Sequence, residues 1–514
     1  MTIYRSDRPA PVVPKLSVTE YILEHAVERG DHPALIEGAT GRTITYAELS
    51  HQIHSLAGGL AARGVGPGTT WALLAPNLPE YVIAFHGLAL CGATTTTLNP
   101  TYGAEEIAFQ LKDSQASAIL TIGLFLETAK SAAAACGIEE IVVIGPGEGT
   151  PFASLFGEPL EGQVQVDLTD DVVVLPYSSG TTGFPKGVML THHNLVSNIE
   201  QFFGHAGLDE DEVVYAVLPF FHIYGMQILM NAMMRHGATV VTVPRFDLIQ
   251  MLELTQAHRI TRLFLVPPIV LALAKHPVVA NYDMSSVTQI FSGAAPLGGD
   301  VAEAAAKRLG CSVAQGYGMT ELSPVTHSIP DGDYKAGSVG TLVAGTEARL
   351  IDPETGEDVK AGERGEIWVR GPQVMKGYLN NLEATAVTID ADGWLHTGDV
   401  AVIDADGHTF IVDRLKELIK YKGFQVPPAE LEALLLGEPR IADAAVIGVP
   451  DDEAGELPKA FVVKVPGTDI DAEGVKAYVA GHVASYKQIR LVEFVESIPK
   501  SASGKILRRE LRAR

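Results

Sequence analysis

The clearest pattern of apolar and polar positions in this chain is an amphipathic helix near residue 50. Thr45 and Glu48 have the spacing of a capping box, in which the two side chains bond backbone N–H groups of the first helical turn. Apolar residues then recur on one helical face, at Leu49, Ile53, Leu56 and Leu60, and Gly64 follows them. The pattern therefore predicts a helix with a defined start and a defined end.

Strand and helix patterns alternate along most of the chain. Residues 71–75 are typical of a buried strand, residues 79–90 of a helix, and residues 93–98 of a strand rich in β-branched side chains. Further strands are predicted at residues 138–144, 172–175, 213–218, 239–243 and 261–266. This alternation favours an α/β fold, so we expect residues 1–412 to form a large domain of layered sheets in several subdomains.

A shorter pattern follows residue 416. Helices are predicted near residues 430–436 and 472–482, and strands at residues 444–449, 460–465 and 490–495. We therefore expect residues 417–514 to form a small α+β domain. The residues before it, 413–416, are mainly polar, as suits a short linker between domains that move. We expect them to be a hinge, with Lys416 as its pivot and a mobile C-terminal domain.

Composition and charge narrow the class of protein. The 514 residues are 46% hydrophobic and 19% charged, which is typical of a globular chain with more than one domain. A net charge of -24 would repel phosphate backbones, so we expect no nucleic-acid partner. The chain shows no secretory signal and no apolar run of the ~18 residues that a membrane helix needs. We therefore expect no membrane insertion. Because Cys91, Cys136 and Cys311 have no paired spacing, we also expect a cytoplasmic protein with reduced thiols.

A loop after the strand at residues 172–175 concentrates glycines, hydroxyls and one lysine. Such a loop can present backbone N–H groups, O–H donors and an ammonium to polyphosphate. It is not a Walker loop, because Pro185 precedes Lys186 and Gly187 follows it. A polar hairpin turn without a ligand is the usual alternative for such a cluster. The candidate phosphate-binding residues are Ser178, Ser179, Gly180, Thr181, Thr182, Gly183 and Lys186.

The whole string from Tyr177 to Gly187 resembles the phosphate-binding signature of the adenylate-forming superfamily. That superfamily contains acyl-CoA synthetases, beetle luciferases and the adenylation domains of peptide synthetases. The string from Val412 to Val426 is similar to the 4-coumarate:CoA ligase branch in particular. The resemblance covers nearly the whole chain and implies an enzyme that uses ATP, Mg²⁺ and coenzyme A.

Three further strings carry the same resemblance. Residues 218–225 resemble the second family signature, which implies that His222 lies beside the acyl carboxylate; alone, such an aromatic run is more often core. Residues 292–297 and 315–321 resemble the adenine-binding wall. The implied ATP contacts are Ala294, Ala295, Pro296, Gln315, Gly316, Tyr317 and, on the α-phosphate, Thr320. Glu321 and Thr181 are expected to hold magnesium, which suits one carboxylate plus substrate phosphates.

The last strings place charged residues around the reacting atoms. Asp399 and Arg414 resemble the family's ribose clamp, although such a pair is more often a surface salt bridge. Lys505, which alone would be a solvated lysine, resembles the catalytic lysine that bridges the attacking carboxylate and the α-phosphate. The resemblance also implies adenylate contacts from Lys420 and Gln425, and coenzyme A contacts from Lys422 and Gly423. The implied catalytic residues are Lys505, Lys420, His222, Thr320 and Gln425.

The resemblance also implies an acyl pocket and a two-step reaction. The pocket residues are Tyr224, Ile228, Phe291, Ala294, Gly316, Pro324 and Val325. They are mainly apolar with one phenol, so we expect a flat aromatic or extended acid, with the Tyr224 hydroxyl available to a ring substituent. The acid would first become an acyl-adenylate and then a thioester, with the small domain rotating between the steps.

Several alternatives stay open from the sequence. Hydroxycinnamates lead as substrates, and other aryl acids and medium-chain fatty acids follow. A luciferase-like oxygenase would share the adenylation residues, a peptide-synthetase module would need a carrier domain, and a catalytically silent nucleotide sensor would not need Lys505. The family contains both monomers and homodimers, so either is compatible with the sequence.

Overall fold

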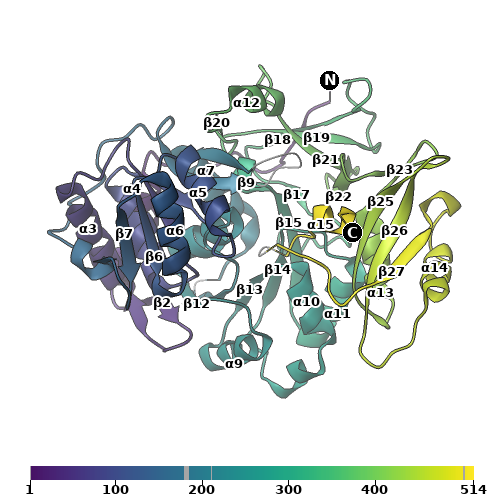
Figure 1. The fold of residues 1–514 in the computed structure, drawn as a ribbon, viewed down its shortest axis with the longest axis horizontal. Helices are drawn as coiled ribbons and strands as arrows, with labels where there is room; N and C mark the ends of the chain where they lie inside the picture. Colours follow the sequence, from purple (N-terminus) through teal and green to yellow (C-terminus); the bar gives the residue numbers. More distant parts are fainter. Residues whose placement is uncertain (1, 179–184, 210, 502–503, 514) are drawn as a thin grey trace.

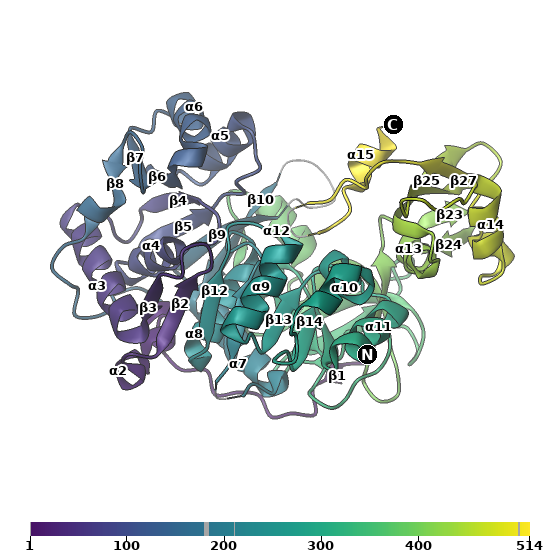
Figure 2. The same ribbon diagram turned by 90° about the horizontal axis from the view of Figure 1, so that it is seen from below.

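The structure is a computed structural model that describes every residue except 1, 179–184, 210, 502–503 and 514. The described residues form four β-sheets, three in the larger N-terminal part and one in the C-terminal part (Figure 1). Figure 2 shows the C-terminal sheet at one end of the molecule, with the chain returning from it toward the large part before α15 (Arg508–Arg512). The predicted α/β class, with a large N-terminal and a small C-terminal domain, is confirmed.

An eight-stranded sheet forms one layer of the large part. Its central strands are parallel, and two antiparallel strands lie at one edge. In order, the strands are β20 (Gly377–Tyr378), β10 (Lys186–Thr191), β9 (Val172–Ser178), β5 (Thr94–Thr97), β4 (Thr70–Leu74), β6 (Ala118–Ile122), β7 (Glu140–Ile144) and β8 (Thr150–Pro151). The helices packed on it are α3 (Tyr46–Ala62), α4 (Pro79–Leu90), α5 (Ala104–Asp113) and α6 (Leu126–Cys136).

A nine-stranded sheet lies beside it. In order, its strands are β17 (Thr341–Leu342), β16 (Val325–Ser328), β15 (Ser312–Gly318), β14 (Gln289–Ser292), β13 (Arg262–Leu265), β11 (Val213–Ala216), β12 (Thr239–Thr242), β2 (Pro33–Glu37) and β3 (Thr43–Thr45). The helices between these strands are α7 (His192–Ala206), α8 (Met233–His236), α9 (Leu248–His258), α10 (Pro267–Lys275) and α11 (Gly299–Leu309). The loops after β9, β14 and β15 follow the carboxyl ends of parallel strands, where open α/β sheets bind ligands.

A five-stranded antiparallel sheet completes the large part. Its strands are β1 (Tyr4–Arg5), β18 (Glu347–Ile351), β19 (Gly365–Arg370), β21 (Leu395–Ile403) and β22 (Thr409–Arg414). The helix α12 (Leu382–Thr388) comes between β20 and β21. Strand β22 ends at Arg414, so this sheet leads directly to the predicted hinge.

The C-terminal part has its own sheet and its own core. Its strands are β24 (Phe424–Val426), β23 (Ile419–Tyr421), β26 (Gly455–Lys464), β25 (Ile441–Asp451) and β27 (Leu491–Phe494), and its helices include α13 (Pro428–Gly437) and α14 (Ala472–Ala480). Apolar residues of these elements pack into clusters separate from the main core, around Val446, Phe461 and Val475. In Figure 1 this part lies beside α10 and α11. A separate core allows it to move as a unit.

Local sequence signals agree closely with these elements. Helix α3 begins with the predicted capping box, in which Thr45 and Glu48 bond each other's backbone N–H groups. The predicted helix at residues 79–90 is α4, with the same bounds. One element was not predicted: residues 225–232 form a π-helix, η3 (Gly225–Ala232), whose side chains are all buried. No sequence signal separated it from an ordinary buried helix.

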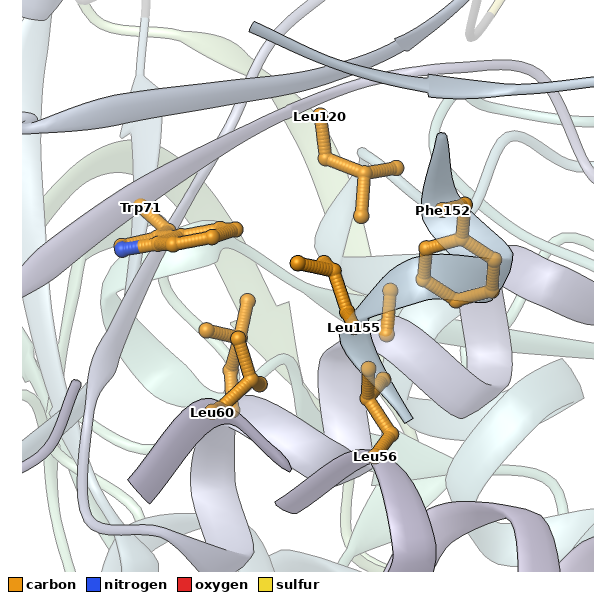
Figure 3. A pocket seen from close by; sticks show the side chains of 8 residues that line it. Leu56, Leu60, Trp71, Leu120, Phe152 and Leu155 are labelled. Atoms are coloured by element: carbon orange, nitrogen blue, oxygen red, sulfur yellow. The ribbon is translucent and has the colours of Figure 1, made fainter. Parts of the chain in front are cut away.

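The core of the large part is tightly packed. Figure 3 shows the small space between α3, α4 and the neighbouring strands, whose apolar lining leaves no room for a water molecule. The lining residues are Leu56, Leu60, Trp71, Ala84, Leu88, Leu120, Phe152 and Leu155. This region therefore stabilises the fold and is no ligand site. Within the described ranges, no helix has both the length and the apolar character needed to cross a membrane.

Candidate active site

The predicted phosphate loop joins β9 to the antiparallel strand β10. Ser178 pairs with Lys186 at the base of this connection. The residues Ser179, Gly180, Thr181, Thr182 and Gly183 lie outside the described residues, so their predicted phosphate and metal contacts are untested. The base itself is anchored, because the Tyr177 hydroxyl donates to Asp113 Oδ2 at 2.7 Å.

Lys186 and Glu321 meet at one tyrosine. The Lys186 ammonium lies 4.6 Å from the centre of the Tyr378 ring, and the Tyr378 hydroxyl donates to Glu321 Oε1 at 2.8 Å. Burial raises the pKa of Tyr378, and the Glu321 carboxylate raises it further, so the phenol keeps its proton. Glu321 is only 3% exposed, in a short turn after β15. Sequence reasoning missed Tyr378, since no local signal connects it with Glu321.

The Glu321 carboxylate fits the predicted magnesium site. No cluster of three or more His, Cys, Asp or Glu side chains suited to a metal occurs among the described residues. A protein cage for a metal is therefore absent from this part of the chain. Magnesium is commonly held by one or two carboxylates together with substrate phosphates, and a single buried carboxylate next to the phosphate loop suits that mode.

Tyr317 and Arg414 converge on Asp399. The Tyr317 hydroxyl donates to Asp399 Oδ2 at 2.6 Å, and Arg414 Nε lies 3.6 Å from Asp399 Oδ1. Burial raises the pKa of Tyr317, and the Asp399 charge raises it further. Asp399 is only 7% exposed, so the pair is not the exposed surface salt bridge of the alternative interpretation. The arrangement leaves a fixed carboxylate that is able to accept ribose hydroxyls.

Lys505, which belongs to the C-terminal part, lies near Asp399, Arg414 and Glu321 of the large part. Burial, and to a smaller extent the charge of Arg414, lower the pKa of its ammonium to about 8, although the carboxylates of Asp399 and Glu321 oppose this shift. A Cβ on Gly504 would lie 3.1 Å from Val266, at the start of α10, so the loop packs closely on the large part. Lys505 is therefore inserted among the predicted site residues and is not a freely solvated lysine.

His222 belongs to the same group of residues. Its Nδ1 accepts a hydrogen bond from the Tyr224 N–H at 3.2 Å, which places the ring proton on Nε2 in the neutral form. Burial, and to a smaller extent the charge of Lys505, lower the pKa of His222 to about 4. At neutral pH the imidazole is therefore an uncharged donor beside the lysine.

The predicted acyl pocket is made by side chains that pack on one another. The Tyr224 hydroxyl donates to the Phe291 carbonyl at 3.2 Å, so its proton is already used by the protein. A Cβ on Gly316 would lie 2.7 Å from the Phe291 ring, so the ring fills the space that this glycine leaves. Ile228 is fully buried in η3, and Val325 is buried at the start of β16. Pro324 is buried just before Val325.

The predicted adenine wall lies at the ends of β14 and β15. Ala294 and Pro296 are exposed and Ala295 is half-buried, and Ala294 has a left-handed backbone with φ 69°. Gln315 is buried, and its Oε1 accepts the Leu297 N–H at 3.2 Å. Thr320 is half-buried next to Glu321.

The remaining predicted residues lie on an exposed hairpin of the C-terminal part. Lys420, Lys422, Gly423 and Gln425 are all exposed on β23, β24 and their turn. Lys422 is paired with Glu453 at 3.0 Å. Lys416 is exposed as well, between β22 and β23. The structure therefore brings Lys505, but not the hairpin residues, to the other site residues.

Comparison with known proteins agrees with this arrangement. The AMP-binding enzyme family matches residues 22–379, and the AMP-binding enzyme C-terminal domain matches residues 430–505. The chain is 46% identical to 4-coumarate–CoA ligase 1 of Petroselinum crispum, over 100% of this chain and 96% of the relative. It is 43% identical to 4-coumarate–CoA ligase 5 of Oryza sativa subsp. japonica, over 100% of this chain and 97% of the relative.

Solved structures give the same result. The anthranilate CoA ligase AuaEII in complex with anthranoyl-AMP is similar with a TM-score of 0.90 and 28% identity, over 99% of this chain and 98% of that one. A benzoate CoA ligase from Burkholderia xenovorans LB400 is similar with a TM-score of 0.89 and 26% identity, over 97% of this chain and 100% of that one. The chain belongs to the AMP-binding enzyme family and aligns along its whole length with acid:CoA ligases that form AMP.

Proposed function

We propose that this protein is an ATP-dependent acid:CoA ligase that forms an acyl-adenylate and then an acyl-CoA thioester, with 4-coumarate or a related hydroxycinnamate as the acid. The observation that carries the proposal is the insertion of Lys505 among His222, Glu321, Asp399 and Arg414. A sensor that only binds nucleotide needs no half-buried lysine at this place. The relatives named as 4-coumarate–CoA ligases support the choice of acid.

In the first step, a carboxylate oxygen of the acid attacks the α-phosphorus of ATP, and pyrophosphate leaves. Negative charge spreads over the attacking carboxylate and the α-phosphate, where the ammonium of Lys505 stabilises it. Neutral His222 donates from Nε2 and helps to orient the acyl carboxylate. Magnesium, when bound by Glu321, neutralises charge on the phosphates. Thr320 and the Asp399–Arg414 pair position the nucleotide.

In the second step, the thiol of coenzyme A attacks the acyl carbon and AMP leaves. We infer that residues 417–514 turn about the hinge at residues 413–416, which removes Lys505 from the site. The exposed hairpin with Lys420, Lys422, Gly423 and Gln425 would then face the adenylate. Its present exposure supports this role, because a polar face that is exposed in one orientation is free to serve in the other.

The acid is expected to be flat and mainly apolar. The pocket side chains Ile228, Phe291 and Val325 offer apolar contact, and the Phe291 ring packs directly against Gly316. Similar structures carry the names of anthranilate and benzoate ligases, which supports an aryl acid over a fatty acid.

The test is AMP release that depends on coenzyme A, measured with 4-coumarate, cinnamate, benzoate, octanoate and palmitate. We expect the highest kcat/KM for a hydroxycinnamate. A preference for octanoate would refute the choice of acid but keep the reaction. Release of AMP without dependence on coenzyme A would refute the acceptor, and light from luciferin, ATP and oxygen would support an oxygenase. Gel filtration distinguishes a monomer from a homodimer, and fractionation tests the proposed cytoplasmic location.

A further inference from the structure

The helix α13 of the C-terminal part is capped by a residue of the large part. Its own N-cap residue is Pro427, which has no side-chain hydrogen bond to the first turn. Instead, the Ala429 N–H donates to Asp413 Oδ2 at 2.8 Å. Asp413 lies in β22, before the predicted pivot Lys416, whereas Ala429 lies after that pivot. The contact therefore crosses the hinge, and any rotation at Lys416 must change it.

Asp413 and Arg414 are neighbours in the sequence, but their side chains contact different parts of the molecule. Successive side chains of a strand point to opposite faces. Arg414 points to Asp399 in the nucleotide site, and Asp413 points to α13. The other oxygen of Asp413 accepts the Arg414 N–H at 2.7 Å, so the carboxylate is held at both oxygens. Of these two neighbours, the predicted ribose-clamp residue Arg414 is the one whose side chain lies near Asp399.

Helix α13 also holds the segment that carries Lys505. Glu432 accepts two hydrogen bonds from Arg508, each at 2.7 Å, and a third from the Val446 N–H at 2.8 Å. Arg508 follows Lys505 by three residues, and its charge also acts on Asp413. The position of α13 thus sets the position of the lysine through a buried ion pair.

The far end of α13 has a weaker contact of the same kind. The Lys275 ammonium, at the end of α10, donates to the Leu436 carbonyl at 2.8 Å. The large part therefore presents an anion to the N-terminus of α13 and a cation to its C-terminus, which suits the helix dipole. Lys275 is exposed, whereas Asp413 is 7% exposed. Solvent therefore screens the contact of Lys275 with Leu436 far more than the contact of Asp413 with Ala429.

We propose that Asp413 acts as a latch between the two domains. Its hydrogen bond to the first turn of α13 holds Lys505 in the nucleotide site, and this bond breaks when the hinge turns. The proposal rests on the proposed two-step function. Asp413 is a positioning residue, because it acts on the reacting atoms only through α13, Glu432 and Arg508.

The burial of Asp413 explains how such a latch is able to open. Burial raises the pKa of the Asp413 carboxyl, and the charge of Arg508 opposes this shift only in part. The ionised carboxylate is therefore less favourable here than in water, despite its hydrogen bonds. Exposure on rotation recovers this cost, which offsets the loss of the contact to Ala429.

The test measures the orientation itself as well as the activity. A Cβ on Gly298 would lie 3.7 Å from the Cβ of Ala433, a separation that suits a disulfide between α13 and the start of α11. The rate at which the pair Gly298→Cys and Ala433→Cys forms a disulfide under mild oxidation reports how often this orientation occurs. Each single cysteine variant controls for Cys91, Cys136 and Cys311.

Asp413→Asn is compared with Asp471→Asn in this background. Asp471 caps α14 by accepting the Gly474 N–H at 2.7 Å, wholly within the C-terminal part, so it offers the same chemistry without crossing the hinge. We expect Asp413→Asn to slow cross-linking by about tenfold, the effect of losing a buried hydrogen bond to a charged group. ATP–pyrophosphate exchange should fall by about the same factor, while thioester formation from supplied acyl-adenylate persists. Asp471→Asn should change none of the three.

Unchanged cross-linking by Asp413→Asn would overturn the latch, and so would an equal fall with Asp471→Asn. If the native protein performs neither half-reaction, the proposed function fails, and the cross-linking rates still decide on the latch. If Asp413→Asn does not fold, Lys275→Met tests the other end of α13 on an exposed side chain. There we expect slower cross-linking by about threefold, with Lys275→Arg restoring the native rate.

Discussion

The C-terminal part presents two polar surfaces with very different surroundings. The loop before α15 inserts Lys505 among charged residues of the large part, where burial lowers the lysine pKa to about 8. The hairpin of β23 and β24 carries Lys420, Lys422 and Gln425 in solvent. Both surfaces resemble family strings with roles in catalysis, yet only one of them reaches the site. The difference indicates that the structure has the orientation suited to adenylate formation.

This comparison also explains why one pocket serves two reactions. The first step needs a cation between the carboxylate and the phosphate, and the second needs an open route for a thiol. In the present orientation Lys505 lies near enough to His222 for its charge to contribute to the lowered pKa of the histidine. The proposed rotation of the whole small domain would exchange the two surfaces without any change in the walls of the acyl pocket.

Fixing the present orientation should abolish the second step. In the oxidised Gly298→Cys and Ala433→Cys pair, the disulfide between α11 and α13 prevents rotation. We expect ATP–pyrophosphate exchange to continue and thioester formation to cease, and a reductant should restore thioester formation. The reduced protein is the control. Continued thioester formation in the fully oxidised protein would show that no rotation is needed.

Removing the inserted lysine should have the next largest effect. Lys505→Ala removes a charge contact in the transition state of the first step, so exchange should fall by roughly a hundredfold to a thousandfold. Thioester formation from supplied acyl-adenylate should change little. Lys500→Ala is the matched control in the same loop, because Lys500 is paired with Asp443 at 2.6 Å within the C-terminal part. An equal loss in both half-reactions would contradict the comparison of the two surfaces.

Blocking the exposed hairpin should give the opposite result. Gly423 has φ 82° and open space around it, so a leucine there strains the backbone but clashes with nothing in the present orientation. We expect Gly423→Leu to slow thioester formation by roughly tenfold to a hundredfold and to leave exchange nearly intact. Gly407→Leu has the same backbone strain, with φ 84°, in an open turn elsewhere. A similar defect in both variants would assign the loss to strain.

Much of the fold was predictable from local signals. The capping box of α3, the bounds of α4 and the alternation of strands follow from short-range periodicity, which one sequence contains. The π-helix η3 and the pairing of Glu321 with Tyr378 were not predictable, because both depend on contacts between segments far apart in the chain. The sequence motifs did predict Asp399 and Lys505 as candidate site residues.

The different uses of Asp413 and Arg414 show the same limit within the site. Asp413 and Arg414 are adjacent in the same sequence motif, but their side chains lie on opposite faces of strand β22. The elements packed on each face therefore determine which residues each side chain contacts. The Tyr224 hydroxyl is a second case. From the sequence we expected it to be available to a substituent of the substrate, but in the structure it donates its proton to the Phe291 carbonyl. Side-chain direction and competition for hydrogen bonds are tertiary properties.

The smallest expected effect is a pH dependence that differs between the two half-reactions. Lys505 stabilises the first step only as a cation, and burial lowers its pKa to about 8, so the active form is lost as the pH rises through that value. At pH 9 about a tenth of the lysine remains charged, and kcat/KM for exchange should be about tenfold below its plateau. His222, with a pKa of about 4, stays neutral over this range and does not contribute.

Lys505→Arg separates this titration from other causes, because a guanidinium keeps its charge above pH 9. The variant should exchange more slowly at neutral pH, since its charge lies elsewhere, but its alkaline decline should disappear. Thioester formation from supplied acyl-adenylate should instead rise with pH as the thiol ionises, since Lys505 has left the site. An alkaline decline shared by both half-reactions, or one retained by Lys505→Arg, would assign the titration to another group and remove the electrostatic distinction between the two surfaces.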